Sequence, residues 1–397
     1  MREVEKFSKN SNQNLQDRVL LHYTGILDDE IIPTVIDRLT NDDWSLIIQK
    51  AKAHGVAPLI YDRIFDECCV PDDIAQKFRL AYLYCSFSNT RQHHELSMML
   101  TKFKTEGINV IVLKGLAVAG LFYENIAFRP MIDIDLLVKS EDVSRIDKML
   151  SELGWQNCSQ RLTGDIQYEK NLVFIDLNSM IHDLPKLNPW ISASFVKLDE
   201  LNIPTLGLDD LLLFLCVHLD KHIHTGFSEL IRLCDIVKLL RKYKNEIDWD
   251  YIAKTAIENG AECSVYRVLS LFRDLPDTHI PSSIFSHLKN DGFCVSIFDT
   301  LQIPEILIYP TKHTDLSIGV KSKMLPTGRK LSAILHSICP KREYMVYRYT
   351  PKRPKLFYLY YPKRIALGIK IALRSLRQKR QTYGCQPSGI YSSTDDK

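Results

Sequence analysis

The stretch from Ile132 to Val138 constrains the fold of this chain more than any other. It reads Ile-Asp-Ile-Asp-Leu-Leu-Val, a buried-strand composition that Asp133 and Asp135 interrupt. Residues two apart on a strand point to the same face of a sheet, so both carboxylates project side by side from an element that otherwise belongs in a core. Adjacent carboxylates repel each other unless a cation lies between them. The pattern is compatible with a divalent metal site, typically Mg²⁺, or with a strand end that reaches solvent.

Length and composition narrow the class of protein. The chain has 397 residues, 45% of them hydrophobic and 25% charged, which predicts a globular protein of two or three domains. A formal net charge of +3 is too small to indicate nucleic-acid binding by itself. The 10 cysteines include no C-x-x-C spacing, so we expect reduced thiols rather than disulfides or a zinc site. Without a secretory start or an apolar run of membrane-spanning length, we expect a cytoplasmic protein, at most peripheral at the inner membrane face.

Hydrophobic periodicity divides the chain into helical and mixed segments. Residues 108–113 and 172–177 are apolar runs of strand type, and with the Ile132–Val138 strand and the intervening helices they predict a mixed α/β unit. We therefore expect an α+β fold, in which a small mixed β-sheet core is flanked by helical regions. The expected parts are an N-terminal extension (1–40), a helical region (41–105), the α/β core (106–207), a helical bundle that completes a cleft (208–275), a C-terminal region (276–340), a basic aromatic segment with an amphipathic helix (341–381) and a disordered tail (382–397).

Several motifs of the expected core resemble a known family. They are residues 107–115 (GINVIVLKG), Tyr123, residues 129–138 (RPMIDIDLLV) and residues 153–155 (LGW). Together they resemble the largely uncharacterised nucleotidyltransferase family of bacteria, which belongs to the wider DNA polymerase beta-like superfamily. The likeness extends over about residues 44–275, through residues 54–59, His218, Lys221, His222, residues 233–235 and residues 248–249.

The resemblance implies a metal-dependent transfer of a nucleoside monophosphate. In such an in-line displacement, Mg²⁺ (or Mn²⁺) held by shared carboxylates neutralises charge on the attacking and leaving oxygens of a nucleoside triphosphate. The likeness assigns Asp133 and Asp135 as metal ligands, and Asp176 as the third ligand or as the base that deprotonates the acceptor. Asp176 lies centrally in an apolar run, where an unpaired carboxylate is costly. Pairing of Asp176 with a local Arg or Lys is the alternative.

The same resemblance indicates residues that could bind the triphosphate. The superfamily has a Gly-Gly or Gly-Ser pair after its first strand, whereas here Lys114-Gly115 is followed by Leu116, so the hydroxyl is missing. Backbone N–H groups after Gly115 and the ammonium of Lys114 could still contact phosphate oxygens. Arg129 could clamp a phosphate bidentately; alternatively, it is a surface arginine before a proline turn.

Two expected helices of the 208–275 bundle carry further candidates. We expect His218, Lys221 and His222 on one helix, and Arg232 and Asp235 on the next, to face the sheet and to contact phosphates or the acceptor. The alternative is an ordinary polar helix face. A structural zinc site is disfavoured, because the sequence offers neither a third ligand nor the H-E-x-x-H motif.

The segment 341–381 carries a marked charge asymmetry. Glu343 is its only acidic residue among many Lys and Arg, and an amphipathic stripe runs through residues 363–381. This pattern is typical of a helix lying on an anionic membrane surface or of a polyanion-binding surface. A helix docked on the protein with a solvated basic edge is the alternative.

The expected function is that of a Mg²⁺-dependent nucleotidyltransferase acting on a hydroxyl or phosphate acceptor. Surface-polysaccharide or natural-product biosynthesis is the setting that the family resemblance suggests. Two alternatives stay open. One is a nucleotidyltransferase-like protein that binds or assembles partners at the membrane without catalysis, and the other is a toxin-like transferase acting on RNA or protein.

Overall fold

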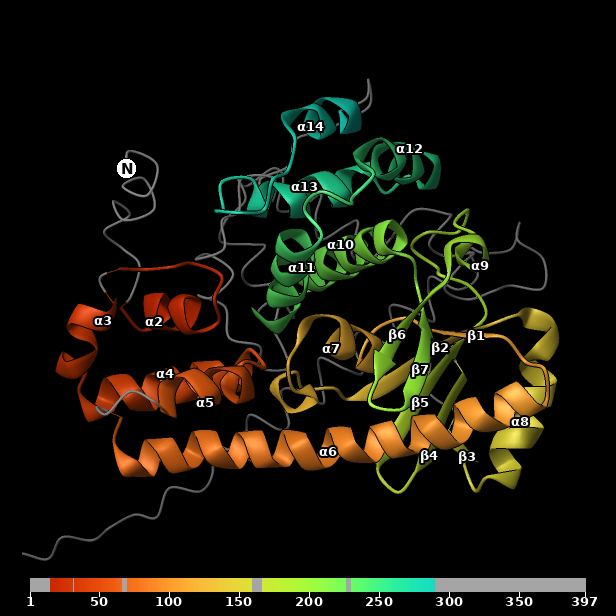
Figure 1. Cartoon of the computed structure of the whole chain (residues 1–397), viewed down its shortest axis with the longest axis horizontal. Coiled ribbons are helices and arrows are strands. Elements are labelled where there is room, and N and C mark those ends of the chain that lie inside the picture. Colours follow the sequence, from red (N-terminus) through yellow and green to blue (C-terminus); the bar gives the residue numbers. More distant parts are fainter. Residues whose placement is uncertain (1–14, 31, 66–69, 159–165, 226–229, 290–397) are drawn as a thin grey trace, which may run out of the picture. The chain divides into compact units, whose positions relative to one another are not determined.

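The computed structural model describes residues 15–289, except residues 31, 66–69, 159–165 and 226–229 (Figure 1). It confirms an α+β fold, with one mixed sheet and helices on both of its faces. The expected basic aromatic segment (341–381), the tail (382–397) and most of the C-terminal region (276–340) lie outside the described residues. Within the described part, none of the helices is both long enough and apolar enough to cross a bilayer.

The described residues form a seven-stranded sheet in the order β3-β4-β5-β2-β1-β7-β6. Its strands are β1 (Val110–Val112), β2 (Asp133–Val138), β3 (Gln156–Asn157), β4 (Ile166–Lys170), β5 (Val173–Asn178), β6 (Ser194–Leu198) and β7 (Leu201–Thr205). The central strand β2 runs antiparallel to β1 and parallel to β5. These three strands are the apolar runs visible in the sequence, whereas the outer four are short or rich in polar residues and have no such signal.

The N-terminal helices lie beside the sheet and along one of its faces (Figure 1). They are α2 (Leu15–Tyr23), α3 (Ile32–Val35), the 3-10 turn η1 (Ile36–Arg38), α4 (Asn41–Ala53), α5 (Ala57–Phe65) and α6 (Asp72–Thr105). Thr40 and Asp43 form a capping box that starts α4, and Gly55, at φ +69°, turns the chain from α4 into α5. Helix α6 has 34 residues and is therefore about 50 Å long, which allows it to contact both the other N-terminal helices and the sheet.

The remaining helices connect the strands or form the bundle that follows them. The connecting elements are α7 (Leu116–Phe122), η2 (Ile126–Phe128), η3 (Ser140–Asp142), α8 (Val143–Glu152) and α9 (Pro189–Ser192). The bundle consists of α10 (Leu208–Thr225), α11 (Leu230–Lys242), α12 (Trp249–Asn259), α13 (Glu262–Phe272) and α14 (Ser282–Leu288). The bundle stacks on the side of the sheet opposite α6 (Figure 1).

Alternation along β2 divides its side chains between two hydrophobic clusters. Ile134, Leu136 and Val138 pack in the cluster that includes Phe103 of α6 and Leu150 of α8. Leu137 belongs instead to the larger cluster formed with α10 and α11. Asp133 and Asp135 share the face of Leu137 by the period of two. The alternation therefore directs both carboxylates toward the bundle, which is the side on which a substrate cleft was expected.

Candidate active site

The register between β2 and β5 brings three carboxylates together. In this parallel pair Asp135 lies directly beside Asp176, and Asp133 lies two residues earlier on the same face of β2. Each carboxylate offers an oxygen atom that lies within 4.8 Å of those of the other two. All three positions are fixed by main-chain pairing within a sheet, so the cluster is built into the fold.

Lys114 supplies a positive charge to this cluster. The N–H of Leu113 donates to the carbonyl of Asp135 at 3.1 Å, which sets the next residue at the end of β1 beside the carboxylates. The Lys114 Nζ atom lies 3.1 Å from Asp135 Oδ2 and 3.8 Å from Asp133 Oδ1. Burial opposes the charge of the ammonium, but Asp135 and Asp133 outweigh that effect and raise the pKa of Lys114. The lysine is therefore held charged between the two aspartates.

Burial and mutual repulsion act on the carboxylates of the cluster. Burial raises the pKa of Asp135 to about 7; Lys114 opposes this rise, while Asp133 and Asp176 add to it. A cluster of three carboxylates is an all-oxygen donor set. Such a set fits a hard divalent cation such as Mg²⁺ or Mn²⁺.

Gln167 orients the third carboxylate, and sequence patterns did not reveal it. Its Nε2 atom donates to Asp176 Oδ1 at 2.7 Å from the directly opposite position on β4. The β4–β5 hairpin sets this register by a two-residue turn, in which Asn171 and Leu172 have φ of 50° and 63°. A positive φ is unusual for leucine. The assignment of Leu172 to the strand was therefore wrong, since β5 begins at Val173.

Two histidines of α10 lie within electrostatic reach of Lys114. His218 and His222 are one turn apart, with ring centroids separated by 4.5 Å. Burial lowers the pKa of both, to about 3 for His222, and the charges of Lys114 and Arg232 add to the effect. Both imidazoles are consequently neutral near pH 7, so they can donate or accept hydrogen bonds without adding charge. Lys221 pairs with Asp183 on the surface, with Nζ 3.3 Å from Oδ2.

Arg129 and Asp235 form a buried pair between the core and α11. The guanidinium is bidentate to the carboxylate, with Nε 2.9 Å from Oδ1 and Nη2 2.8 Å from Oδ2. The hydroxyl of Tyr123 also donates to Asp235 Oδ1, at 2.8 Å. Arg129 is 7% exposed, so its interpretation as a surface arginine was wrong. The pair fastens α11 to the segment that precedes β2, and direct contact of either residue with a ligand stays a prediction.

The middle of α6 supports the same segment from the other side. Asn89 Nδ2 donates to the carbonyls of Ile126 and Arg129, and Gln92 Nε2 donates to the carbonyl of Met131 at 3.0 Å. Both amide side chains are buried. Polar residues in a long helix resemble a solvent-facing stripe, so sequence patterns gave no reason to select them. Their hydrogen bonds hold the chain immediately before Asp133.

Gly115 turns the chain from β1 into α7. Its backbone angles, φ 64° and ψ −115°, lie in a region that is accessible to glycine and strained for other residues. A Cβ atom at this position would lie 3.5 Å from Met131 Sδ and 3.6 Å from the carbonyl oxygen of Asp133, which is ordinary van der Waals contact, so the requirement for glycine comes from the backbone angles. Contact of this turn with phosphate oxygens stays a prediction.

Comparisons with known proteins identify a family that this chain matches. Residues 40–276 match the sequence profile of a family described as an uncharacterised nucleotidyltransferase. A solved antigenic nucleotidyltransferase-like protein from Paracoccidioides brasiliensis is similar over 48% of this chain and 94% of its own, at 12% identity and a TM-score of 0.32. A tRNA nucleotidyltransferase, solved with a primer tRNA and an incoming ATP analog, is similar over 71% and 99%, at 13% identity and a TM-score of 0.23. No curated protein matches the chain.

The substitution Asp235→Asn tests the structural importance of the buried pair. It leaves the Arg129 guanidinium buried without its counter-ion, so we expect the free energy of unfolding to fall by about 3 kcal/mol or more. Urea denaturation measures the change. The matched control is Asp73→Asn, which breaks an exposed pair with Lys77 on α6 and should leave stability unchanged. Equal stability of the two variants would contradict the role assigned to the pair.

The substitution Lys114→Met tests whether the ammonium competes with a metal ion. A unit-charge pair about 4 Å apart near a protein surface is worth about 4 kcal/mol, so its removal should tighten Mn²⁺ binding to the nucleotide-free protein by at least about tenfold. Titration calorimetry measures the affinity. Lys170→Met is the control, because its amine pairs with Glu95 at 2.9 Å, away from the three aspartates. Unchanged or weaker Mn²⁺ binding in Lys114→Met would show that the lysine does not compete.

Proposed function

Because this chain belongs to the uncharacterised nucleotidyltransferase family, we propose that it transfers a nucleoside monophosphate from a nucleoside triphosphate to a hydroxyl or phosphate acceptor. The observation that carries the proposal is the meeting of Asp133, Asp135 and Asp176, whose oxygens approach within 4.8 Å on two paired strands. In the proposed reaction an acceptor oxygen attacks the α-phosphorus, the bond from this phosphorus to the bridging oxygen breaks, and pyrophosphate leaves.

The three aspartates are the proposed holders of Mg²⁺ (or Mn²⁺). A bound divalent ion would neutralise charge on the triphosphate and on the attacking and leaving oxygens. Asp176 has a second proposed role, because a carboxylate beside the attacking oxygen can accept the proton that a hydroxyl acceptor loses. The hydrogen bond from Gln167 to Oδ1 fixes the orientation of Asp176 for either role.

Lys114 is the proposed phosphate ligand at the end of β1. Its ammonium lies between Asp133 and Asp135. With a triphosphate and its metal ion bound, the flexible four-carbon stem would allow the ammonium to turn from the carboxylates to phosphate oxygens. Gly115 would leave the backbone accessible to the same phosphates, in place of the missing hydroxyl of the superfamily's motif.

The bundle supplies the opposite wall of the proposed site. Arg232 would contribute charge to phosphate binding, and the neutral imidazoles of His218 and His222 would hydrogen-bond phosphate or acceptor oxygens. For Lys221, which pairs with Asp183, we propose a contact at the rim. For Arg129 and Asp235 we propose a supporting role, since each side chain is directed to the other.

The finer features of the function are also proposals. They are membership of the DNA polymerase beta-like superfamily, a bacterial and cytoplasmic setting, ATP as one of the accepted nucleotides, and a role in surface-polysaccharide or natural-product biosynthesis. What supports them is the likeness of residues 107–138 to the family's motifs. The proposed contact of segment 341–381 with an anionic membrane or polyanion rests on its basic and aromatic composition.

Nucleotide binding by carboxylate variants tests the proposed function. We expect the full-length protein to bind a fluorescent nucleoside triphosphate with Mg²⁺ and to lose binding in EDTA. Asp135→Asn and Asp176→Asn should weaken binding by at least about 100-fold, whereas Gln167→Leu should weaken it by about 10- to 100-fold, as is typical of outer-shell groups. Asp73→Asn on α6 is the matched control and should bind normally.

Turnover is then measured as release of labelled pyrophosphate with a panel of hydroxyl and phosphate acceptors. Metal-independent binding that Asp135→Asn leaves intact would refute the proposal. That result would favour the alternative of a non-catalytic binding or assembly protein.

A further inference from the structure

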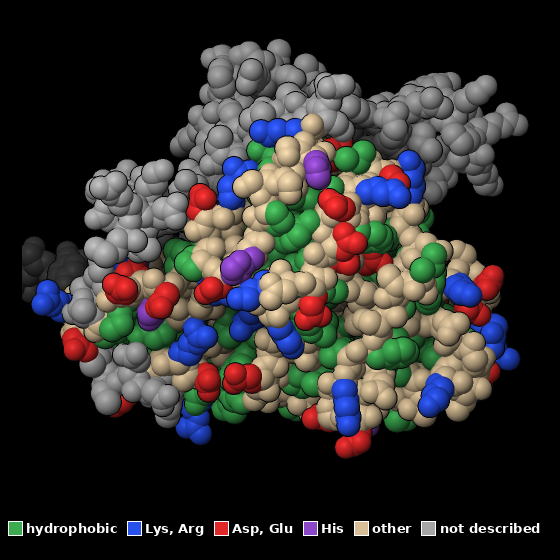
Figure 2. Space-filling view, turned by 45° about the horizontal axis from the view of Figure 1, so that its top comes forward, with side chains coloured by type: hydrophobic (Ala, Val, Ile, Leu, Met, Phe, Trp, Pro, Cys, Tyr) green, Lys and Arg blue, Asp and Glu red, His purple; other side chains and the backbone are tan. Residues whose placement is uncertain are grey.

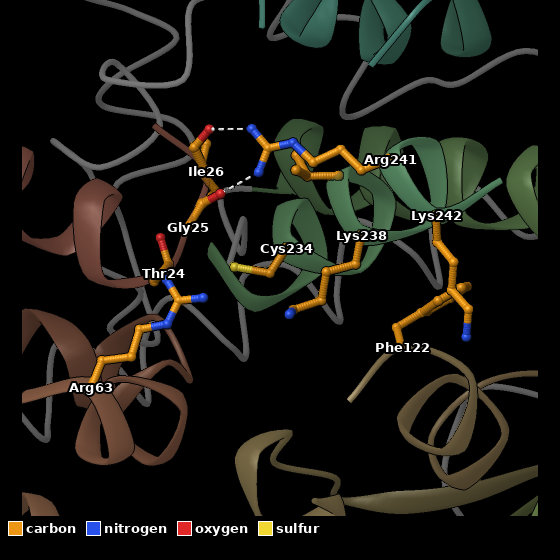
Figure 3. A pocket seen from close by; sticks show the side chains of 10 residues that line it. Thr24, Gly25, Ile26, Arg63, Phe122, Cys234, Lys238, Arg241 and Lys242 are labelled. Carbon is orange, nitrogen blue, oxygen red and sulfur yellow. Dashed lines mark hydrogen bonds between the residues drawn. The ribbon is translucent and has the colours of Figure 1, made fainter. Parts of the chain in front are cut away.

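A second pocket, which none of the three aspartates lines, lies between α11 and the N-terminal helices (Figure 3). Its volume is about 340 Å³. Four of its lining side chains are cationic: Arg63 of α5 and Lys238, Arg241 and Lys242 of α11. Within the described part of the chain, the residues that line it include no Asp or Glu. The pocket is therefore a concentration of positive charge separate from the carboxylate cluster.

Backbone carbonyls hold three of these cations in place. Arg241 donates to the carbonyls of Gly25 and Ile26 (Figure 3), in the latter case from Nη2 at 3.0 Å. Lys242 Nζ donates to the carbonyl of Leu121 at 2.7 Å. Arg63 Nη1 lies 3.4 Å from the carbonyl of Tyr23. A neutral carbonyl orients a cation without cancelling its charge, so these three side chains are positioned and still attract an anion. Asp277 and Asp28, which do not line the pocket, offset part of the charge of Arg241.

The charged form of Lys238 is disfavoured by its surroundings, so a bound anion would stabilise it. The half-buried side chain places its ammonium over the ring of Tyr123, 4.9 Å from the centroid. No carboxylate among the described residues forms an ion pair with it. Burial lowers the pKa of Lys238, and the charge of Arg63 adds to that effect, whereas Glu124 and Asp235 oppose it from outside the pocket. An anion beside Lys238 would offset both the burial and the repulsion.

The loop after α2 also packs closely against the Arg63 side chain at the wall of the pocket. Gly25, at φ +72°, carries the loop after α2 past Arg63, and a Cβ atom at this position would lie only 2.9 Å from Arg63 Nη1. Cys234 is 1% exposed where it contributes to the lining. Across the face shown in Figure 2, Lys and Arg side chains are interspersed with Asp and Glu. Among the described residues that line the pocket, the four cations have no such acidic neighbour.

We propose that this pocket binds the phosphate group of a small molecule. Four cations without a lining carboxylate suit a multiply charged oxyanion, for which arginine and lysine are the usual protein partners. A volume of about 340 Å³ lies at the small-ligand end of the range for such sites. Lys238 and Arg63 are the direct ligands, and Arg241 and Lys242 contribute charge from the wall. The proposal is independent of the proposed transferase activity, because it uses none of the three aspartates.

Calorimetric titration of the full-length protein in EDTA at low ionic strength tests this site. The probes are inorganic phosphate, pyrophosphate and a nucleoside triphosphate, and the strongest binder identifies the free anion, a polyphosphate or a nucleotide as the source of the group. We expect Lys238→Met and Arg63→Met to weaken binding at least about tenfold each. The two side chains lie on different helices, so loss in both variants does not depend on one local distortion. Thermal unfolding of each variant confirms that it is folded.

Two controls make the result decisive. Lys254→Met removes an exposed lysine of α12 and should leave phosphate binding unchanged, as should Asp135→Asn, which disrupts the carboxylate cluster. The proposal is overturned if the wild-type protein binds none of the three probes, or if Lys254→Met weakens binding as much as Lys238→Met. It is also overturned if loss of binding follows Asp135→Asn instead of the pocket variants.

Discussion

Repulsion among three carboxylates is the constraint around which the described part of this protein is organised. Asp135 and Asp176 are neighbours because β2 and β5 pair in parallel, and Asp133 follows from the alternation of β2. Unlike carboxylates on a loop, these groups cannot move apart without breaking the register of the sheet. Lys114 lies between Asp133 and Asp135 and relieves part of the repulsion. A divalent cation among the three carboxylates, as proposed above, would relieve more of it.

Buried hydrogen-bonding side chains position the cluster from both sides of the sheet. From α6, the amides of Asn89 and Gln92 hold the carbonyls before β2, and from α11, Asp235 holds Arg129. Loss of one partner of a buried bidentate pair is strongly destabilising. The intact pair therefore holds the bundle at a fixed distance from the sheet. The histidines of α10 are thereby kept opposite Lys114. The protein uses its buried polar groups to position elements around the site.

The central part of the site could be predicted from the sequence, because its signals are local. The period of two around Asp133 and Asp135 and the single carboxylate in the apolar run of Asp176 are visible without any tertiary contact. Gln167 was missed because its role depends on a hairpin register set by Leu172 in a left-handed conformation. The partnership of Arg129 with Asp235 joins residues 106 positions apart. Such pairings depend on how α11 packs against the core. The periodicity of hydrophobic residues along the sequence does not predict this packing.

Anomalous diffraction from crystals grown with Mn²⁺ and a non-hydrolysable nucleoside triphosphate tests the central claim most directly. We predict a manganese peak coordinated by oxygens of Asp133, Asp135 and Asp176, with the triphosphate on the bundle side and Lys114 turned toward its phosphates. A structure with the nucleotide bound elsewhere, no manganese among the three aspartates and Lys114 still between Asp133 and Asp135 would contradict it.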